Sequence, residues 1–277
     1  MDPPQALTYL NLACVPAAGQ SDADLLKLHQ DAVTKLGKPI PNAGHPEILD
    51  IPADCAPHVN QLLGMPWAAS IFASLPGWSI KLVEIEPLLT LQFHVLVERS
   101  EKHCSPLQSS SVLDLMPVCL PTAEPHVDVA MTPIMRGTQS VMIKTRELAT
   151  TQIDAGVFPL QANGAQIQFV GMLFRYGSPF VYVARYNGRC FLANGYHRAS
   201  GLSRAGATHM PCIFRDATTP EEMGVKTDGS TLSIQRLEAD NPPAVGHFTQ
   251  GRALEVQLRM ASRIFHASWS EYTMADE

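Results

Sequence analysis

The chain has 277 residues, of which 45% are hydrophobic and 17% charged, a composition that supports a substantial core and excludes general disorder. Its net charge of −6 and isoelectric point of about 5.9 disfavour nucleic-acid binding, because neutralising phosphates requires a basic surface. No run of about 18 apolar residues is present and the first residues lack a signal-peptide pattern, so we expect a cytoplasmic protein without a membrane span.

The N-terminal segment, residues 1–76, is predicted to form a small helical layer. Capping residues and apolar spacing predict a first helix over 21–37, a second over 53–63 and a third over 67–74. The dipeptide Pro76-Gly77 then interrupts the helical pattern. The core of the chain is therefore expected to begin directly after this segment.

Two segments compete for the first strand of the core. Residues 80–92 form an apolar run that charged side chains interrupt, among them Glu84 and Glu86, as expected for a partly exposed strand. Residues 139–148 fit the same role, and the sequence does not decide between the two. If the first segment is correct, the core contains a long insertion at about 93–165.

The most specific pattern of the chain lies in residues 181–214. Asn187-Gly188 stands between two apolar runs and predicts a two-residue hairpin, because both central residues of such a turn take positive φ. A helix is predicted from His197 to Ala205, with Gly206 placed to end it in a left-handed conformation. A short strand is predicted to follow over 209–214.

The loop Asn194-Gly195-Tyr196-His197-Arg198 lies where a strand gives way to this helix. Helix N-termini present unpaired N–H groups and a positive dipole end, so anions bind there readily. Arg198 is expected to hold phosphate oxygens with its planar fork, and Gly195 to let the backbone approach. His197 is suited to donating to a phosphate or transferring a proton, and Asn194 to orienting a sugar or a metal-bound water. The alternative is that His197 and Arg198 only cap and pack the start of the helix.

At these residues the chain resembles the ParB/sulfiredoxin-like superfamily. That group has a strand, then Gly, a variable residue, His and Arg, then a helix ending in Gly and a strand containing Pro, here Gly195 to Arg198, Gly206 and Pro211. The resemblance implies an α+β fold with a small mixed sheet and flanking helices. It also implies a loop, Asn194 to Arg198 with Tyr196 included, that holds the phosphates of a nucleotide with Mg²⁺. Glu84 or Glu86 would then be the acidic partner that holds Mg²⁺ or activates a nucleophile, with His197.

The loop also departs from individual members of the superfamily. Sulfiredoxin needs a Cys directly before the His-Arg pair, where this chain has Tyr196, so its thiol chemistry is excluded. A free-serine kinase and several nuclease-like proteins of the superfamily have His at that position. Partitioning proteins carry a helix-turn-helix and a basic surface after this domain, and residues 217–277 show neither.

Two functions remain open at this point. The first is a protein that binds a nucleotide or a phosphorylated small molecule at the loop, with phosphoryl-transfer or hydrolase activity undecided. The second is a non-catalytic regulatory module that binds DNA or a protein partner through the same fold. The acidic isoelectric point, about 5.9, disfavours DNA.

Three regions follow from these patterns: a helical N-terminal segment, a core over 77–216, and residues 217–277 as a polar linker with a C-terminal amphipathic helix. That helix is predicted over 251–272, and we expect it to pack on the core or to mediate homo-oligomerisation. Within the core, residues 104–138 are rich in proline and are predicted to be irregular.

Arginine and cysteine residues near the loop carry weaker signals. The arginines are typical either of an anion-binding surface or of ordinary surface residues. The cysteines form no CxxC pair and show no zinc-ligand spacing, so no metal site is predicted. They are expected to be buried thiols. A redox or nucleophilic role is the alternative at Cys190 and Cys212. The arginines concerned are Arg175, Arg185, Arg189, Arg198, Arg204 and Arg215.

Overall fold

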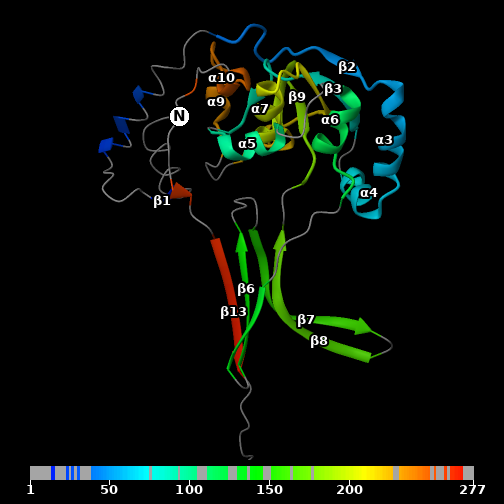
Figure 1. Ribbon diagram of the computed structural model, residues 1–277, viewed down its shortest axis with the longest axis vertical. Coiled ribbons are helices and arrows are strands. Elements are labelled where there is room, and N and C mark those ends of the chain that lie inside the picture. The colour runs from blue at the N-terminus through cyan, green and yellow to red at the C-terminus, as the bar shows by residue number, and fades with distance from the viewer. Residues whose placement is uncertain are drawn as a thin grey trace, which may run out of the picture. The chain divides into compact units, whose positions relative to one another are not determined.

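The computed structural model of the chain (Figure 1) describes part of its length, and all statements below concern that part. The described residues are 14–15, 23–24, 26–27, 30–31, 39–74, 77–92, 94–104, 111–123, 130–135, 138–145, 151–162, 165–175, 178–226, 231–249, 253, 259–260 and 263–270. The chain divides into two units, which are described separately. Unit 1 comprises residues 1–10, 18–124 and 179–257, and unit 2 comprises residues 11–17, 125–178 and 258–277.

Unit 1 is built on a six-stranded sheet with the strand order β2-β3-β11-β9-β10-β4. Strand β11 runs antiparallel to β3 and parallel to β9, and β10 runs antiparallel to β9 and parallel to β4. This mixed sheet with its helices confirms the α+β class. The strands are β2 (Ile48–Asp50), β3 (Ser79–Glu84), β4 (Leu89–Thr90), β9 (Tyr182–Tyr186), β10 (Arg189–Asn194) and β11 (His209–Asp216).

The two candidate first strands lie in different units. Residues 80–92 supply β3 and β4 to the sheet of unit 1, whereas residues 139–148 supply β6 (Thr138–Thr145) to unit 2. The segment that leaves unit 1 between β4 and β9 is 125–178, which differs from the insertion predicted at about 93–165. Unit 1 therefore keeps the two helices that follow β4.

The helices of unit 1 include two that the sequence predicted closely. The prediction over 53–63 corresponds to a 3₁₀ turn followed by α3, and the prediction over 67–74 corresponds to α4, which starts at Pro66. Of the helix predicted over 21–37, the described positions are helical. The helical elements are η1 (Ala53–Cys55), α3 (Ala56–Leu63), α4 (Pro66–Ala73), α5 (Val97–Cys104), α6 (Val112–Cys119), α7 (Tyr196–Arg204), α8 (Pro220–Met223), α9 (Ile234–Leu237) and α10 (Gly246–Thr249).

The hairpin, helix and strand predicted in 181–214 are confirmed. Asn187 and Gly188 have φ of 48° and 76°, the positive values that a two-residue hairpin turn requires. Helix α7 ends in a Schellman motif: Gly206 has φ 90°, its N–H donates to the Ser203 carbonyl, and the Ala207 N–H donates to the Leu202 carbonyl, both at 3.0 Å.

Strand β11 tolerates Pro211 because its pairing with β9 begins only after this residue. Pro211 pairs with Leu82 of β3, while pairing of β11 with β9 starts only at Ile213. The missing N–H of proline therefore removes no bond to β9. Around this strand the core is apolar, and Val83, Leu192 and Ile213 are fully or almost fully buried. Burying each such side chain contributes about 1.5–3 kcal/mol.

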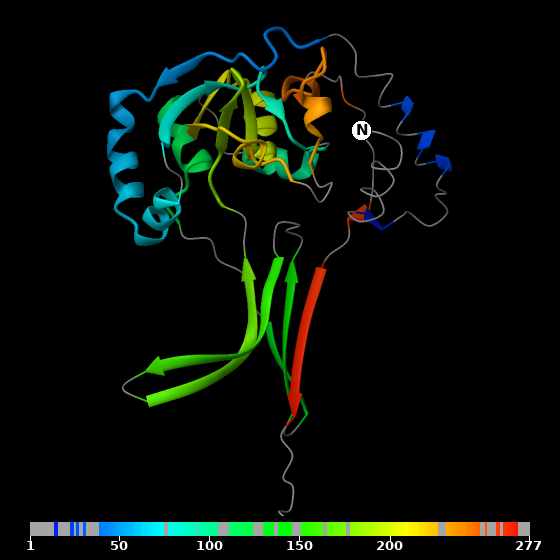
Figure 2. The same cartoon turned by 180° about the vertical axis from the view of Figure 1, so that it is seen from behind.

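Unit 2 consists of β-strands in its described residues. Strands β5 (Ala130–Met135), β6 and β13 (Arg263–Ser270) form an antiparallel sheet in the order β13-β6-β5. Strands β7 (Thr151–Ala162) and β8 (Ala165–Arg175) form a long antiparallel hairpin, visible from behind in Figure 2. The short strands β1 (Cys14–Val15) and β12 (Arg259–Met260) pair with each other.

The C-terminal helix predicted over 251–272 is wrong where the structure describes that stretch. Residues 259–260 and 263–270 are strands β12 and β13. Phe265, Ala267 and Trp269 recur at every second position, so the stretch also carries a strand pattern, and pairing with β6 along all of β13 favours it. Self-association through a C-terminal helix therefore loses its basis.

The prediction of irregular structure over 104–138 is wrong at two places. Helix α6 occupies one, because the Ser111 side chain caps it by accepting from the Asp114 N–H at 3.3 Å. Strand β5 occupies the other, and its register shifts next to Pro133, where proline cannot donate to the ladder. None of the helices among the described residues is long and apolar enough to cross a membrane.

Candidate functional site

Gly195 sets the geometry of the predicted loop. It is the N-cap of α7, with φ 98° and ψ 23°. A Cβ at this position would lie 2.8 Å from Cγ2 and 3.3 Å from Cα of Val181. Both the left-handed backbone and this close approach require glycine. Because Gly195 has no side chain, it cannot supply the acceptor that Ser, Thr, Asp or Asn gives to the N–H groups of a first helical turn.

Asn194 holds the chain segment that returns to unit 1. Its Nδ2 donates to the Phe180 carbonyl at 2.6 Å. The next residue of that segment, Val181, donates its N–H to the Cys119 carbonyl at 3.0 Å. The Asn194 amide therefore fixes backbone on the N-terminal side of β9, in addition to any contact with a ligand.

Arg198 is tied to main-chain carbonyls. Its Nη1 donates to the carbonyls of Val118 and Cys119 at 3.3 Å each, and also to the carbonyl of Pro179. Burial lowers the pKa of Arg198 from its ordinary value, yet a guanidinium remains charged at neutral pH. In the described part of the chain no carboxylate forms an ion pair with it. Carbonyl oxygens thus satisfy the N–H groups of Nη1 without neutralising the charge.

Three further arginines of this region cap helices in the same way. Arg189 donates to the last carbonyl of α9 at 2.9 Å, Arg204 donates to a carbonyl of α10 at 3.2 Å, and Arg215 donates to a carbonyl of α8. The final carbonyls of a helix lack partners within the helix, and cationic donors are favourable there. Helix capping therefore accounts for much of the arginine clustering seen in the sequence.

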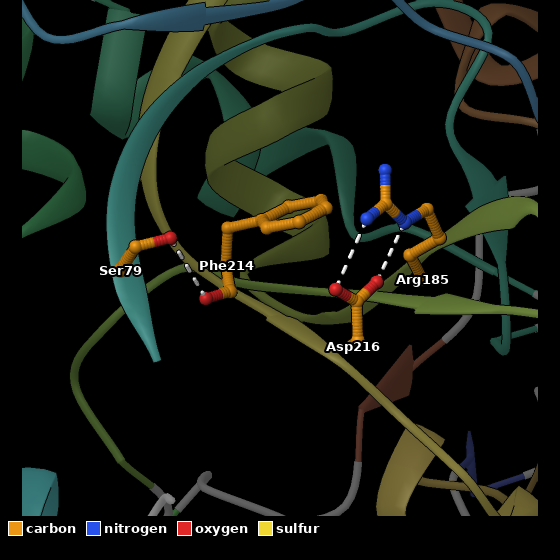
Figure 3. Close-up of polar contacts among 4 residues, drawn as sticks. All are labelled: Ser79, Arg185, Phe214 and Asp216. Atoms are coloured by element: carbon orange, nitrogen blue, oxygen red, sulfur yellow. Dashed lines mark hydrogen bonds and ion pairs between the residues drawn. The ribbon is translucent and has the colours of Figure 1, made fainter. Parts of the chain in front are cut away.

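Arg185 is engaged with a carboxylate at the end of β11. Its Nε and Nη2 donate to the two carboxylate oxygens of Asp216 at 2.6 and 3.0 Å, and its guanidinium carbon lies 5.5 Å from the centre of the Phe214 ring (Figure 3). The hydrogen bond raises the pKa of Arg185 and lowers that of Asp216. In the same view the Ser79 hydroxyl donates to the Phe214 carbonyl at 3.4 Å, joining β3 to β11.

The two candidate carboxylates lie away from the first turn of α7. Glu84 Oε2 accepts from the Glu47 N–H at 3.1 Å, near the β2 edge of the sheet. Glu86 Oε1 accepts from the Ser203 hydroxyl at 3.3 Å. Ser203 lies about 9 Å farther along the axis of α7 than His197, at 1.5 Å per residue. Of the two, only Glu86 contacts the helix that carries the loop.

The remaining loop residues divide between core and surface. Tyr196 is buried, and its hydroxyl donates to the Ala193 carbonyl at 3.3 Å, while burial raises its pKa. Its side chain therefore packs in the core, and only its main chain lies at the start of the helix. His197 is half-buried in the first turn of α7, next to Arg198 in sequence.

Four cysteines, Cys55, Cys119, Cys190 and Cys212, are buried, free thiols. Burial raises the pKa of Cys119 to about 12 and that of Cys190 to about 11, and raises the pKa of Cys212 well above its usual value. Since the thiolate is the nucleophile and the metal ligand, these groups are inert at neutral pH. Among the residues that the structure describes, no cluster of three ligating side chains could hold a metal ion.

Sequence reasoning missed the residues that surround Arg198. Phe180 is fully buried, and its ring stacks on those of Trp67 at 5.5 Å and Phe72 at 5.4 Å. The apolar residues after Pro179 were the only local signal, because carbonyl acceptors such as those of Val118 and Cys119 leave no trace in side-chain patterns. The loop therefore has a structural role that its motif does not indicate.

Chemically, the loop offers hydrogen-bond donors and positive charge. His197 and the half-buried guanidinium of Arg198 lie at the positive end of α7, whereas Glu84 accepts from the Glu47 N–H and Glu86 accepts from the Ser203 hydroxyl. This arrangement is suited to holding an anion more than to transferring protons. No protein-family model, no curated protein and no solved structure matches the chain.

Proposed function

We propose that the Asn194–Arg198 loop binds the phosphate of a nucleotide with Mg²⁺, or of a phosphorylated small molecule, on a core of the ParB/sulfiredoxin-like type. The observation that carries the proposal is the charge of Arg198, whose half-buried guanidinium lies beside the positive end of α7 without a carboxylate partner among the described residues. Withdrawing a cation partly from water costs free energy, and a counter-charge that approaches it offsets this cost. An anion at the first turn of α7 would supply that counter-charge.

The roles of the loop residues follow from their contacts. Main-chain N–H groups of the first turn donate to phosphate oxygens, and Gly195 allows this approach. His197 is the second donor. Arg198 contributes charge and position instead of a two-pronged grip, because its Nη1 already contacts three carbonyls. Asn194 holds the backbone beside the site.

The proposed activity is ligand binding and does not include phosphoryl transfer. Phosphoryl transfer depends on a metal ion held by carboxylates at the reacting phosphate. Glu86 is the nearer candidate, but its contact with Ser203 puts it beside the second half of α7. The expected property is therefore ligand-dependent switching, in the cytoplasm, where nucleotides and Mg²⁺ are available.

Calorimetric titration with ATP, ADP, CTP and inorganic phosphate, each with and without Mg²⁺, tests the proposal. The decisive variants are Arg198→Lys and Arg198→Gln, since both can donate to the carbonyls but only lysine keeps the charge. Arg204→Gln is the matched control, because Arg204 lies in the same helix and caps α10.

The wild type, the lysine variant and the control are expected to bind, and the glutamine variant to lose about tenfold or more in affinity, the effect of one charge-assisted hydrogen bond. Circular dichroism establishes that each variant is folded. Absence of binding to every probe by the folded wild type, or equal affinity in the glutamine variant, would refute the proposal. A salt-dependent shift of duplex DNA would then support the regulatory module instead.

A further inference from the structure

We propose that Asn194, Arg198 and Phe180 form a junction clamp that fixes both connections between unit 1 and the segment 125–178. All three residues belong to unit 1, as do the two pieces of chain that they hold. The loop that resembles a ligand site therefore also holds the backbone of both connections in place.

The outgoing connection is held at the end of α6. The carbonyls of Val118 and Cys119, in the last turn of this helix, accept from Arg198 Nη1. The next carbonyl, that of Leu120, lies 2.8 Å from Nε2 of His58. A cation at a helix C-terminus is favourable, so this end of α6 is fixed before the chain leaves unit 1.

The returning connection is held by a separate set of contacts. The Pro179 carbonyl accepts from Arg198, and the Phe180 carbonyl accepts from Asn194 Nδ2 at 2.6 Å. The Phe180 ring is fully buried and stacks on two aromatic rings of the α4 helix, at 5.5 and 5.4 Å. This return point is thus fixed by both its backbone and its side chain.

The two connections are also joined to each other. One nitrogen of Arg198 donates to carbonyls of both, and the Val181 N–H donates to the Cys119 carbonyl at 3.0 Å. Capping of α6 alone would explain the contacts with Val118 and Cys119 but not the contact with Pro179. A single guanidinium that bridges both pieces of chain is the arrangement expected of a clamp.

Ligand binding and the clamp use the same side chain, which predicts that they are coupled. An anion at the first turn of α7 would hold Arg198 in place, and so tighten the bonds at both connections. This coupling rests on the proposed function, whereas the clamp itself does not.

Hydrogen exchange of the full chain, resolved at single amides, tests the clamp. The reporting amide is that of Val181, whose acceptor is the Cys119 carbonyl. Amides of Ala199 and Ala205, which donate to carbonyls within α7 and at its cap, report whether the helix itself has opened. The variants are Arg198→Met and Asn194→Ala, neither of which can donate to the carbonyls, with Arg204→Met as the control, and Arg198→Ala replaces the first if it does not fold.

Exchange at Val181 is expected to rise about tenfold in both clamp variants, as for the loss of one or two hydrogen bonds, and to stay unchanged in the control. Ala199 and Ala205 should exchange as in the wild type. Unchanged exchange at Val181, or an equal rise at all three amides, would overturn the clamp, because the second result describes general loosening of the helix.

To test the coupling, hydrogen exchange of the wild type is measured with and without ATP and Mg²⁺, at a concentration that calorimetry shows to be saturating. Slower exchange at Val181 is expected if the two are coupled. Binding without any change at Val181 would overturn the coupling alone. Absence of binding would refute the proposed function, while the variants still decide the clamp.

Discussion

Replacing Gly195 with alanine tests the geometry of the loop directly. The new Cβ would meet Val181 at 2.8 Å from Cγ2 and 3.3 Å from Cα, in a backbone with φ 98°. The left-handed conformation costs about 1–2 kcal/mol for a residue with a Cβ. The steric conflict adds about 1–3 kcal/mol, as for overpacking of a core. We therefore expect the free energy of unfolding to fall by about 2–5 kcal/mol.

Gly206→Ala is the matched control for this substitution. Gly206 also has a positive φ, of 90°, but a Cβ there would meet nothing within 4 Å. The control should cost only the conformational term, about 1–2 kcal/mol. The difference between the two alanine variants isolates the contact with Val181. In a Val181→Ala background, from which Cγ2 is absent, Gly195→Ala should cost less by about 1 kcal/mol.

Urea unfolding followed by tryptophan fluorescence measures these differences. The chain has three tryptophans, and a Trp269→Phe background leaves Trp67 and Trp78 as reporters of unit 1. Free energies follow from the midpoint and the slope of each transition. Equal costs for the two alanine variants, with no rescue by Val181→Ala, would show that the close approach of Gly195 to Val181 is wrong.

Three further predictions concern the core of unit 1. Phe180→Ala should lower the free energy of unfolding by about 3–5 kcal/mol in the same assay, because it leaves a cavity between stacked rings. Burial lowers the pKa of His94 to about 4 from an ordinary value of 6.5, so the unfolded chain binds more protons between these values. Stability should therefore be retained above pH 6.5 and fall by up to about 3 kcal/mol towards pH 4, a loss that His94→Gln should reduce in unfolding curves at both pH values. Four of the six cysteines are buried and free: Cys55, Cys119, Cys190 and Cys212. At most two thiols per chain should therefore react with a thiol reagent before the protein unfolds. Reaction of more than two thiols in the folded protein would contradict the burial of these four.

Local signals predicted the elements closest to the loop. The hairpin could be predicted because Asn187 and Gly188 are residue types that readily take positive φ. The end of α7 could be predicted for the same reason, from Gly206. The C-terminal strand could not, because its partner β6 lies far away in the chain and its apolar residues fit a helical spacing as well. Long-range pairing decides such cases.

The candidate site could be located from the sequence, but the contacts within it could not. Asn194 and Arg198 carry the motif, yet their acceptors are carbonyls of Val118, Cys119, Pro179 and Phe180, which no side-chain pattern identifies. Glu84 and Glu86 are two residues apart, so in a continuous strand their side chains would lie on the same face. Strand β3 ends at Glu84, however, so Glu86 lies in the following turn and reaches α7 instead.

Under the proposed function, phosphate binds at the start of α7. A ¹⁵N-resolved NMR titration of the folded chain with ATP and Mg²⁺ would locate the bound ligand residue by residue. We expect the amides of Tyr196, His197 and Arg198 to show the largest, saturable shifts, and Arg198→Gln to raise the ATP concentration at half-saturation about tenfold or more. Amides of this first turn that remain unshifted at saturating ATP, or shifts confined to other elements, would contradict the proposed function.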